Sequence, residues 1–185
     1  IRMFQTGHFF GLISAFNSSL AQTISISKNG SSAFFGESVS SLVAISSRTN
    51  DIEKTNSSFS SNLISAELYS KIKLSDRANL TLSGRRSLTD VFSSPTYKNY
   101  SNRIFQNTEI TNLNNNQIVN YKSDVDFYFY DFTIQYQQKI GQKNNLNIDV
   151  IAIENSLDFN QSTIDLNKNS KLEQENLGST IQWKT

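Results

Sequence analysis

Four segments of the chain alternate between apolar and polar residues, and they form two pairs, each joined by a short turn. The first pair runs from about residue 63 to residue 92 and turns at Ser75-Asp76. The second runs from about residue 124 to residue 158 and turns at Gly141–Asn144. Side chains on a β-strand point alternately to its two faces, so each segment is predicted to be a strand with one apolar and one polar surface. The pattern therefore predicts two long β-hairpins.

The apolar positions are continuous along each predicted strand. They are Ile64, Ala66, Leu68, Ile72 and Leu74, then Ala78, Leu80 and Leu82, then Tyr128, Tyr130, Phe132, Ile134 and Tyr136, and then Leu146, Ile148, Val150 and Ala152. A final run continues the pattern with Leu177, Ile181 and Trp183 and stops within it at Thr185. We expect about five strands of one sheet, and Trp183, Tyr136 and Tyr128 are candidates for aromatic girdles at membrane interfaces.

The opposite faces of these strands are polar, and four charged residues fall on them: Glu67, Arg85, Asp131 and Asp149. Arg85 is followed by Arg86, so one of the two arginines must face the apolar side if the strand continues.

Two short strands, Ile24–Ser27 and Val39–Ser46, precede the hairpins, with a turn signal at Asn29-Gly30 between them. Residues 47–60 have the Ser- and Asn-rich composition of a linker, and residues 93–123 and 158–175 read as polar loops. No segment shows apolar residues at the three- to four-residue spacing that would give a helix an apolar face.

Composition narrows the function classes. With a net charge of +1, we expect no strong electrostatic attraction to nucleic acid. The absence of cysteine excludes disulfides and thiolate metal sites. His8 is the only histidine and lacks partners for a metal site, so we expect no metal and no cofactor. No catalytic motif is present, and we expect no enzyme. The chain starts at Ile1 and ends inside a strand pattern, which we interpret as a fragment of a longer protein.

Short turns at one end of long one-sided strands, with long loops at the other end, are typical of an outer-membrane barrel wall. No apolar run reaches the length of a transmembrane helix, but barrel strands carry a weaker signal. On the strand pattern alone, a soluble sandwich or barrel that covers the apolar faces with a second sheet is an equal alternative.

The N-terminal region resembles the plug domain of TonB-dependent outer-membrane receptors. Ile24–Gly36 is similar to the end of that plug, Val39–Ile45 to its last strand, and Gly7–Asn17 to the preceding plug segment. Ser83–Asp90 resembles an early barrel strand of the same family. The order of these segments, followed within a few residues by long hairpins, carries the resemblance over nearly the whole chain.

The resemblance implies an all-β fold, namely a partial antiparallel transmembrane β-barrel preceded by the end of a small α+β plug domain. Residues 1–50 would be the C-terminal part of the plug, residues 51–60 a linker, and residues 61–185 the first barrel strands with long extracellular loops. Such a receptor lies in the outer membrane of Gram-negative cells. It imports a scarce solute, such as a siderophore, cobalamin, an oligosaccharide or a peptide, with energy from the TonB coupling protein. Its partners would be that protein, a small solute or metal chelate, and membrane lipid.

Two other functions stay open. A surface receptor or adhesion protein that binds a ligand without transport would also suit long aromatic loops. A soluble β-barrel carrier is the weaker alternative, because apolar strand faces without a covering sheet argue against it.

Candidate ligand-binding residues come from the plug-like segment and the first long loop: His8, Phe9, Phe10, Tyr97 and Tyr100, with Phe105 and Tyr121 as further loop aromatics. Each of them could instead simply pack within its segment. The four charged residues of the polar strand faces could form salt bridges between wall and plug, contact the ligand, or be solvated in the lumen.

Overall fold

The computed structural model of this chain describes residues 7–9, 11, 13–20, 23–28, 30, 41–47, 54–104, 122–162 and 167–185. These residues form an all-β fold with antiparallel sheets and one short helix. The predicted fold class is confirmed at this level.

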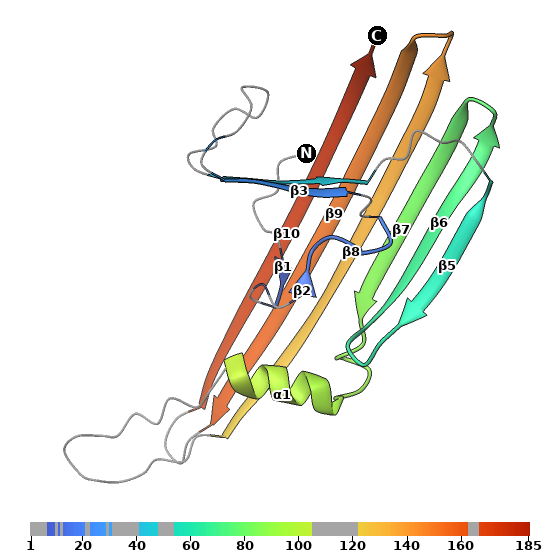
Figure 1. Cartoon of the computed structure of the whole chain (residues 1–185). Coiled ribbons are helices and arrows are strands. Elements are labelled where there is room, and N and C mark those ends of the chain that lie inside the picture. The colour runs from blue at the N-terminus through green and yellow to red at the C-terminus, as the bar shows by residue number, and fades with distance from the viewer. Residues whose placement is uncertain are drawn as a thin grey trace, which may run out of the picture.

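One large sheet dominates the molecule (Figure 1). Its strands are β5 (Asn56–Ser61), β6 (Ser65–Ser75), β7 (Ala78–Ser87), β8 (Lys122–Ile140), β9 (Asn144–Ser162) and β10 (Asn167–Lys184). Each strand pairs with the next along the chain, so the sheet is a simple meander, with β5 and β10 as its edges among the described residues. The sheet has six strands in place of the roughly five expected.

The two tight turns lie at one end of the sheet, as the sequence predicts. β6 and β7 are joined through Asp76-Arg77, one residue later than the predicted Ser75-Asp76, and β8 and β9 are joined through Gly141–Lys143. Gly141 has φ of 66°, a left-handed conformation that glycine adopts without steric cost. The turn chemistry of this second hairpin is therefore local, which is why the sequence located it correctly.

Two segments expected to be irregular are strands. β5 begins inside the predicted linker of residues 51–60, and most of the predicted loop of residues 158–175 belongs to β9 and β10. Both segments carry only scattered apolar residues, so they lack the alternation that marks the other strands. Backbone pairing with a neighbouring strand forms them instead. β9 and β10 are paired without interruption, from Asn145 opposite Lys184 to Ser162 opposite Asn167.

The predicted loop of residues 93–123 contains a helix, α1 (Pro95–Ile104). Ser94 caps it, because its Oγ accepts the Tyr97 backbone N–H at 3.1 Å. A serine followed by proline at the first helical position is a signal for the start of a helix, and this signal does not depend on an apolar stripe.

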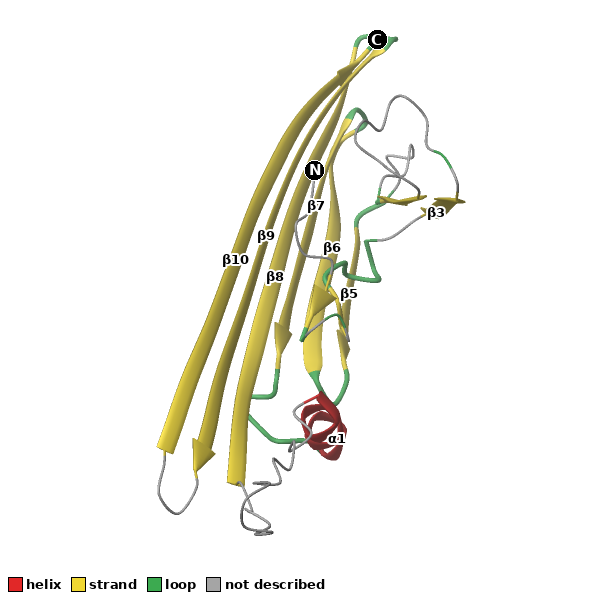
Figure 2. Ribbon diagram, turned by 90° about the vertical axis from the view of Figure 1, so that its left-hand side faces the viewer, coloured by secondary structure: helices red, strands yellow, loops and turns green. Residues whose placement is uncertain are grey.

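The remaining elements are short and lie on one side of the large sheet, together with α1 (Figure 2). β1 (Gly7–His8) pairs with β2 (Ile13–Ser14), and β3 (Thr23–Lys28) pairs with β4 (Ser41–Ser46). The strand predicted at Ile24–Ser27 is confirmed within β3, and the one predicted at Val39–Ser46 is confirmed from Ser41 on, because residues 39 and 40 lie outside the described residues. We call the covered side of the large sheet its inner face and the opposite side its outer face.

The apolar core lies on the inner face, towards the loop end of β8 and β9. It joins the N-terminal segment and α1 to the sheet through six buried residues: Phe9, Tyr97, Val125, Phe127, Phe129 and Leu157. Phe9 stacks on Phe127 with ring centroids 4.6 Å apart.

Candidate functional site

The inner face of the large sheet buries many polar side chains beside the apolar core, and the outer face exposes apolar side chains. The buried polar side chains of its inner face come from β7, β8 and β9: Asn79, Thr81, Ser83, Arg85, Ser87, Asp131, Thr133, Asn147, Asp149 and Asn155. On the outer face, Phe59, Leu68 and Leu177 are 71%, 56% and 80% exposed. A soluble sheet normally has the reverse arrangement.

A buried polar network joins the N-terminal segment to this inner face. His8 Nε2 lies 3.2 Å from Asp131 Oδ2, and its Nδ1 lies 2.6 Å from Asn155 Oδ1. Arg85 Nε donates to the same Asp131 oxygen at 2.7 Å, and Arg85 Nη2 donates to the Ser14 carbonyl at 2.5 Å. The Asp131 carboxylate and the Asn155 amide oxygen both only accept, and the tautomer of His8 decides which ring nitrogen donates. We call His8, Arg85, Asp131 and Asn155 the polar latch.

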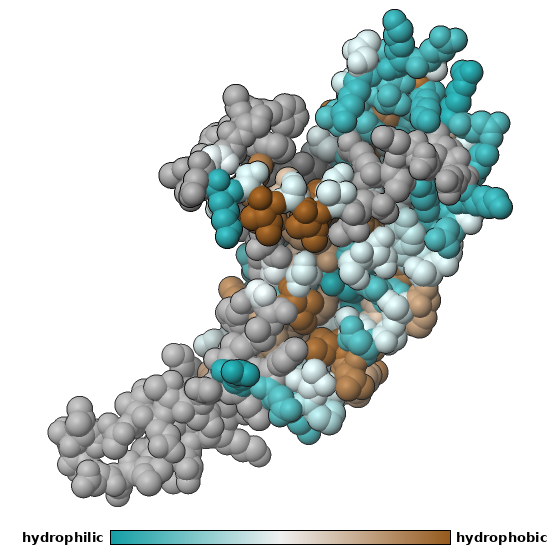
Figure 3. All heavy atoms as spheres, viewed as in Figure 1, coloured by the Kyte–Doolittle hydropathy of each residue, from teal (hydrophilic) through white to brown (hydrophobic). Residues whose placement is uncertain are grey.

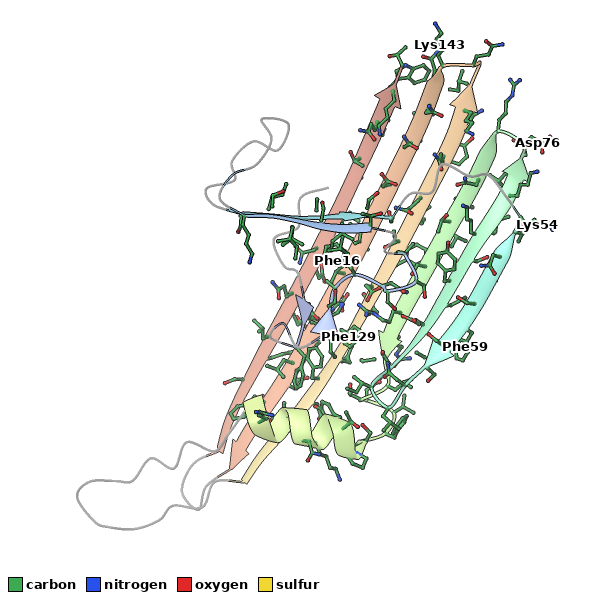
Figure 4. All side chains as sticks on the ribbon, in the orientation of Figure 1. Phe16, Lys54, Phe59, Asp76, Phe129 and Lys143 are labelled. Atoms are coloured by element: carbon green, nitrogen blue, oxygen red, sulfur yellow. The ribbon has the colours of Figure 1, made fainter. Side chains whose placement is uncertain are left out.

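Phe129, labelled in Figure 4, lies against two side chains of the latch. The His8 ring stacks on it at a centroid distance of 4.1 Å with 18° between the planes. The Arg85 guanidinium carbon lies 5.4 Å from the same ring centroid, a cation–π contact. The fully buried Phe129 thus orients the two side chains that reach Asp131.

The electrostatics of the latch make its members depend on one another. The Arg85 and Asp131 side chains are only 8% and 3% exposed. A buried ion pair offsets the cost of removing its charges from water only when its geometry and hydrogen bonds are good. Asp131 meets this condition because Arg85 Nε and His8 Nε2 both contact its Oδ2. Loss of Arg85 or of Asp131 therefore leaves the other charge buried without full compensation.

Further contacts fasten the N-terminal region along the inner face. Asn17 Nδ2 donates to Ser83 Oγ at 2.7 Å, and the Ser19 backbone N–H donates to Asn17 Oδ1 at 2.8 Å. Ser19 Oγ lies 3.5 Å from Glu67 Oε1. The region after β4 is also tied to the sheet, because Gln135 Nε2 donates to Ser47 Oγ at 2.5 Å.

Helix α1 is tied to the loop end of β8 by hydrogen bonds to its backbone. Tyr97 Oη donates to the Val125 carbonyl at 2.5 Å, and Thr89 Oγ1, just before the helix, donates to the Phe127 carbonyl. The Tyr97 ring lies 6.0 Å from Phe9. The helix therefore closes one side of the aromatic core.

The structure brings five of the predicted site residues together. His8, Arg85 and Asp131 meet in the latch, and Phe9 and Tyr97 meet in the adjoining core. His8 and Phe9 are 0% and 2% exposed, so in this conformation they pack within the protein. Their predicted role as ligand contacts stays a prediction.

The other predicted residues have different positions. Glu67 is partly buried and accepts hydrogen bonds from Ser19 and Ser60. Asp149 is buried on the inner face, opposite Gln135 in the register. Arg85 faces inwards and Arg86 outwards, where it pairs with Asp90, so the expected division of the two arginines is confirmed. Phe10, Phe105, Tyr121 and the side chain of Tyr100 lie outside the described residues.

Sequence reasoning missed Asn17, Phe129 and Asn155 as members of this site. Strand alternation places Phe129 and Asn155 on the same face as Asp131, because β8 and β9 pair Phe129 with Asn155. Strand alternation alone could therefore have indicated Phe129 as a neighbour of Asp131. No local signal marks Asn17, since its partner Ser83 is 66 residues away.

The outer face carries an apolar band that crosses every strand. One register row reads Phe59, Leu68, Gly84, Phe132, Ala152 and Leu177 from β5 to β10. Rows closer to the tight turns add Leu80, Tyr136, Ile148 and Ile181, and then Leu146 and Trp183. Gly84 is the one position in the first row without a side chain.

Aromatic and charged residues border this band on both sides. Trp183 and Tyr136 lie near its turn end, whereas Tyr130 and Tyr128 lie at its loop end with Arg86, Glu154 and Glu175. From Phe132 to Gln138 the band is about 20 Å long at about 3.4 Å per residue. A strand tilt of about 40° reduces this to about 16 Å, compared with an apolar height of about 25 Å in outer-membrane barrels.

Within the described ranges, no three His, Cys, Asp or Glu side chains are grouped so as to hold a metal ion. No helix in the described part of the chain is long and apolar enough to cross a membrane. No protein-family model matches the chain, and neither does any curated protein or solved structure.

Proposed function

We propose that this chain forms part of the wall and of the internal plug of a TonB-dependent receptor in the outer membrane of a Gram-negative cell. Such a receptor imports a scarce solute. The observation that carries the proposal is the inverted sheet, with a bare apolar band on the outside and buried polar side chains on the inside.

The inverted sheet fits lipid better than water. In water, exposing an apolar band across six strands would invite aggregation, since monomeric soluble proteins rarely expose large apolar patches. In a bilayer the same band needs no covering sheet, and its aromatic borders lie where amphipathic rings are favoured. A soluble carrier with a covering sheet is therefore a poorer account of this face.

The polar latch supports the plug part of the proposal. Together with the Asn17–Ser83 hydrogen bond, it attaches His8, Ser14 and Asn17 to the inner face, which is how a segment inside a lumen would be held. The outer membrane has no ATP, so release of a tightly bound solute requires force from the inner membrane. In this mechanism solute binding shifts the plug towards a state that TonB engages, and force on the plug then breaks the latch.

The first test is fractionation of cells that express the full-length protein, followed by electrophoresis of outer-membrane extracts with and without boiling. A closed, detergent-resistant barrel gives an outer-membrane band whose mobility changes on boiling. A soluble or periplasmic protein with no mobility change would remove the transporter proposal.

A second test separates transport from binding alone. Deleting the N-terminal TonB-contacting segment of the full-length protein should abolish solute uptake and leave solute binding intact. Uptake that survives the deletion would contradict energised import. Binding by the intact protein with no uptake at all would identify a surface receptor or adhesion protein.

A further inference from the structure

Strands β8, β9 and β10 reverse the polarity of their two faces along their length. Towards the tight turns their outer face carries the apolar band, and their inner face carries amides and hydroxyls such as Gln137, Asn147 and Thr180. Figure 3, which looks onto the inner side, shows hydrophilic side chains over this end of the sheet. Towards the loops the arrangement is the opposite one.

At the loop end the inner face of these strands is apolar and the outer face is polar. Val125, Phe127 and Leu157 belong to the buried core on the inner side. Two neighbouring register rows of the outer face carry the charged residues Asp126, Asp158, Lys171 and Glu173. This is the ordinary pattern of a sheet that packs one face on a core and turns the other face to water.

The reversal falls on one register row of the outer face. This row reads Arg86, Tyr130, Glu154 and Glu175 from β7 to β10, and we call it the boundary row. The next row towards the turns reads Gly84, Phe132, Ala152 and Leu177 and carries no charge. In the boundary row Tyr130 Oη donates to Glu154, and Arg86 pairs with Asp90. Charged side chains among lipid tails are costly, so tails that cover the band are expected to end at this row.

The sheet also narrows at this level. β7 ends at Ser87, whereas β8 continues beyond that level to Lys122. From Tyr130 to Lys122 this continuation is about 27 Å long at about 3.4 Å per residue. Helix α1 lies against its inner side, where Tyr97 Oη donates to the Val125 carbonyl. The continuation is therefore packed as a helix on a sheet, an arrangement that water-soluble domains use.

We propose that the outer face of β8–β10 changes its partner at the boundary row, from lipid tails on the turn side to water on the loop side. Residues 122–129, 155–162 and 167–174, together with α1, then form a lobe that projects from the membrane. This inference rests on the proposed function, because it requires the apolar band to lie in a bilayer. Asp131 directly follows Tyr130, so the polar latch is placed at the level of the membrane surface and not at the middle of the wall.

The experiment maps which partner each outer position meets. The chain contains no cysteine, so one introduced cysteine directs a nitroxide spin label to one chosen position. The full-length protein, with any cysteine outside this chain replaced, is reconstituted into phosphocholine vesicles. Collisions of the label with oxygen, which concentrates among lipid tails, are then compared with collisions with a water-soluble nickel chelate.

Four variants on β10 test the boundary row from both sides. Labels at Leu177→Cys and Ile181→Cys should collide preferentially with oxygen, because these positions lie in the band. Labels at Glu173→Cys and Lys171→Cys, on the same face of the same strand, should collide preferentially with nickel. All four side chains are exposed, so the label requires no repacking of the core.

A matched pair on β8 repeats the comparison. Phe132→Cys lies on the band side of the boundary row and Asp126→Cys on the loop side, and both side chains are exposed. The preference should again reverse from oxygen to nickel between them. If a β10 variant fails to insert, this pair decides the question.

The two possible failures differ. An oxygen preference that continues through Glu173, Lys171 and Asp126 would overturn the boundary while the band stays in the bilayer. A nickel preference at Leu177, Ile181 and Phe132 as well would place the band in water and would overturn the proposed membrane wall itself.

Discussion

His8 and Asp131 are 123 residues apart in the sequence, yet His8 Nε2 lies 3.2 Å from Asp131 Oδ2 with both side chains buried. Asp131 also accepts a hydrogen bond from Arg85, so one carboxylate joins the N-terminal segment to two strands of the sheet. Loss of Asp131 would therefore affect both the His8 contact and the Arg85 contact.

Replacing Asp131 with alanine should destabilise the protein by about 3–5 kcal/mol, because Arg85 would stay buried without its carboxylate. The measurement is denaturant unfolding of the protein in detergent or bilayers. Asp131→Asn should also be destabilising, since the amide is neutral.

Asp126→Asn is the matched control, because Asp126 lies on the same strand but is exposed. It should change the free energy of unfolding by no more than about 0.5 kcal/mol. Equal effects at the two positions would contradict the latch.

Leu177→Arg tests the outer band directly. Leu177 is 80% exposed, so in water an arginine there should be nearly neutral, within about 0.5 kcal/mol. In a bilayer the same change should cost about 2–4 kcal/mol near the midplane. The measurement is folding into lipid vesicles.

Glu173→Arg, on the same strand beyond the band, is the control for the added charge. A Leu177→Arg variant that folds into vesicles as well as this control would mean that lipid does not cover the band.

Gly7→Ala should displace the N-terminal segment. An added Cβ would lie 2.8 Å from the Gly11 Cα and 3.0 Å from the Ile13 carbonyl oxygen, and neither backbone atom can move away cheaply. We expect a loss of about 1–3 kcal/mol from overpacking beside His8.

Gly84→Ala offers the comparison, since its Cβ would meet only a Phe132 side-chain carbon at 3.7 Å. The free energies of unfolding of the two variants, measured with denaturant, should therefore differ clearly. A neutral Gly7→Ala would show that the turn between β1 and β2 is not tightly packed.

Ser94→Ala should weaken α1 by about 1 kcal/mol, because the helix loses the side chain that caps the Tyr97 N–H. Ser94→Asp should restore most of the loss, as aspartate is an equally good cap. Hydrogen exchange of the helix amides measures the effect, and unchanged protection in Ser94→Ala would contradict the capping role.

The division of the strand residues between two faces could be read from the sequence, because alternation is a local property of extended backbone. Alternation therefore places Arg85 and Asp131 on the polar faces of their strands without knowledge of their contact. The extent of β9 and β10 could not be read, since their polar ends are held by pairing with each other rather than by an apolar face. Helix α1 was missed because its evidence is a cap and not a stripe.

The sequence by itself determined the strands that alternate between apolar and polar residues, their two-sided character and the two tight turns between them. Only the tertiary structure decided which face is covered, and it covered the one that carries Arg85 and Asp131. The physical reason is that burial depends on what packs against a face, and here residues 7–20 bring hydrogen-bonding partners to the polar side chains. The meeting of His8, Arg85 and Asp131 likewise depends on chain segments far apart in the sequence, which no local pattern encodes.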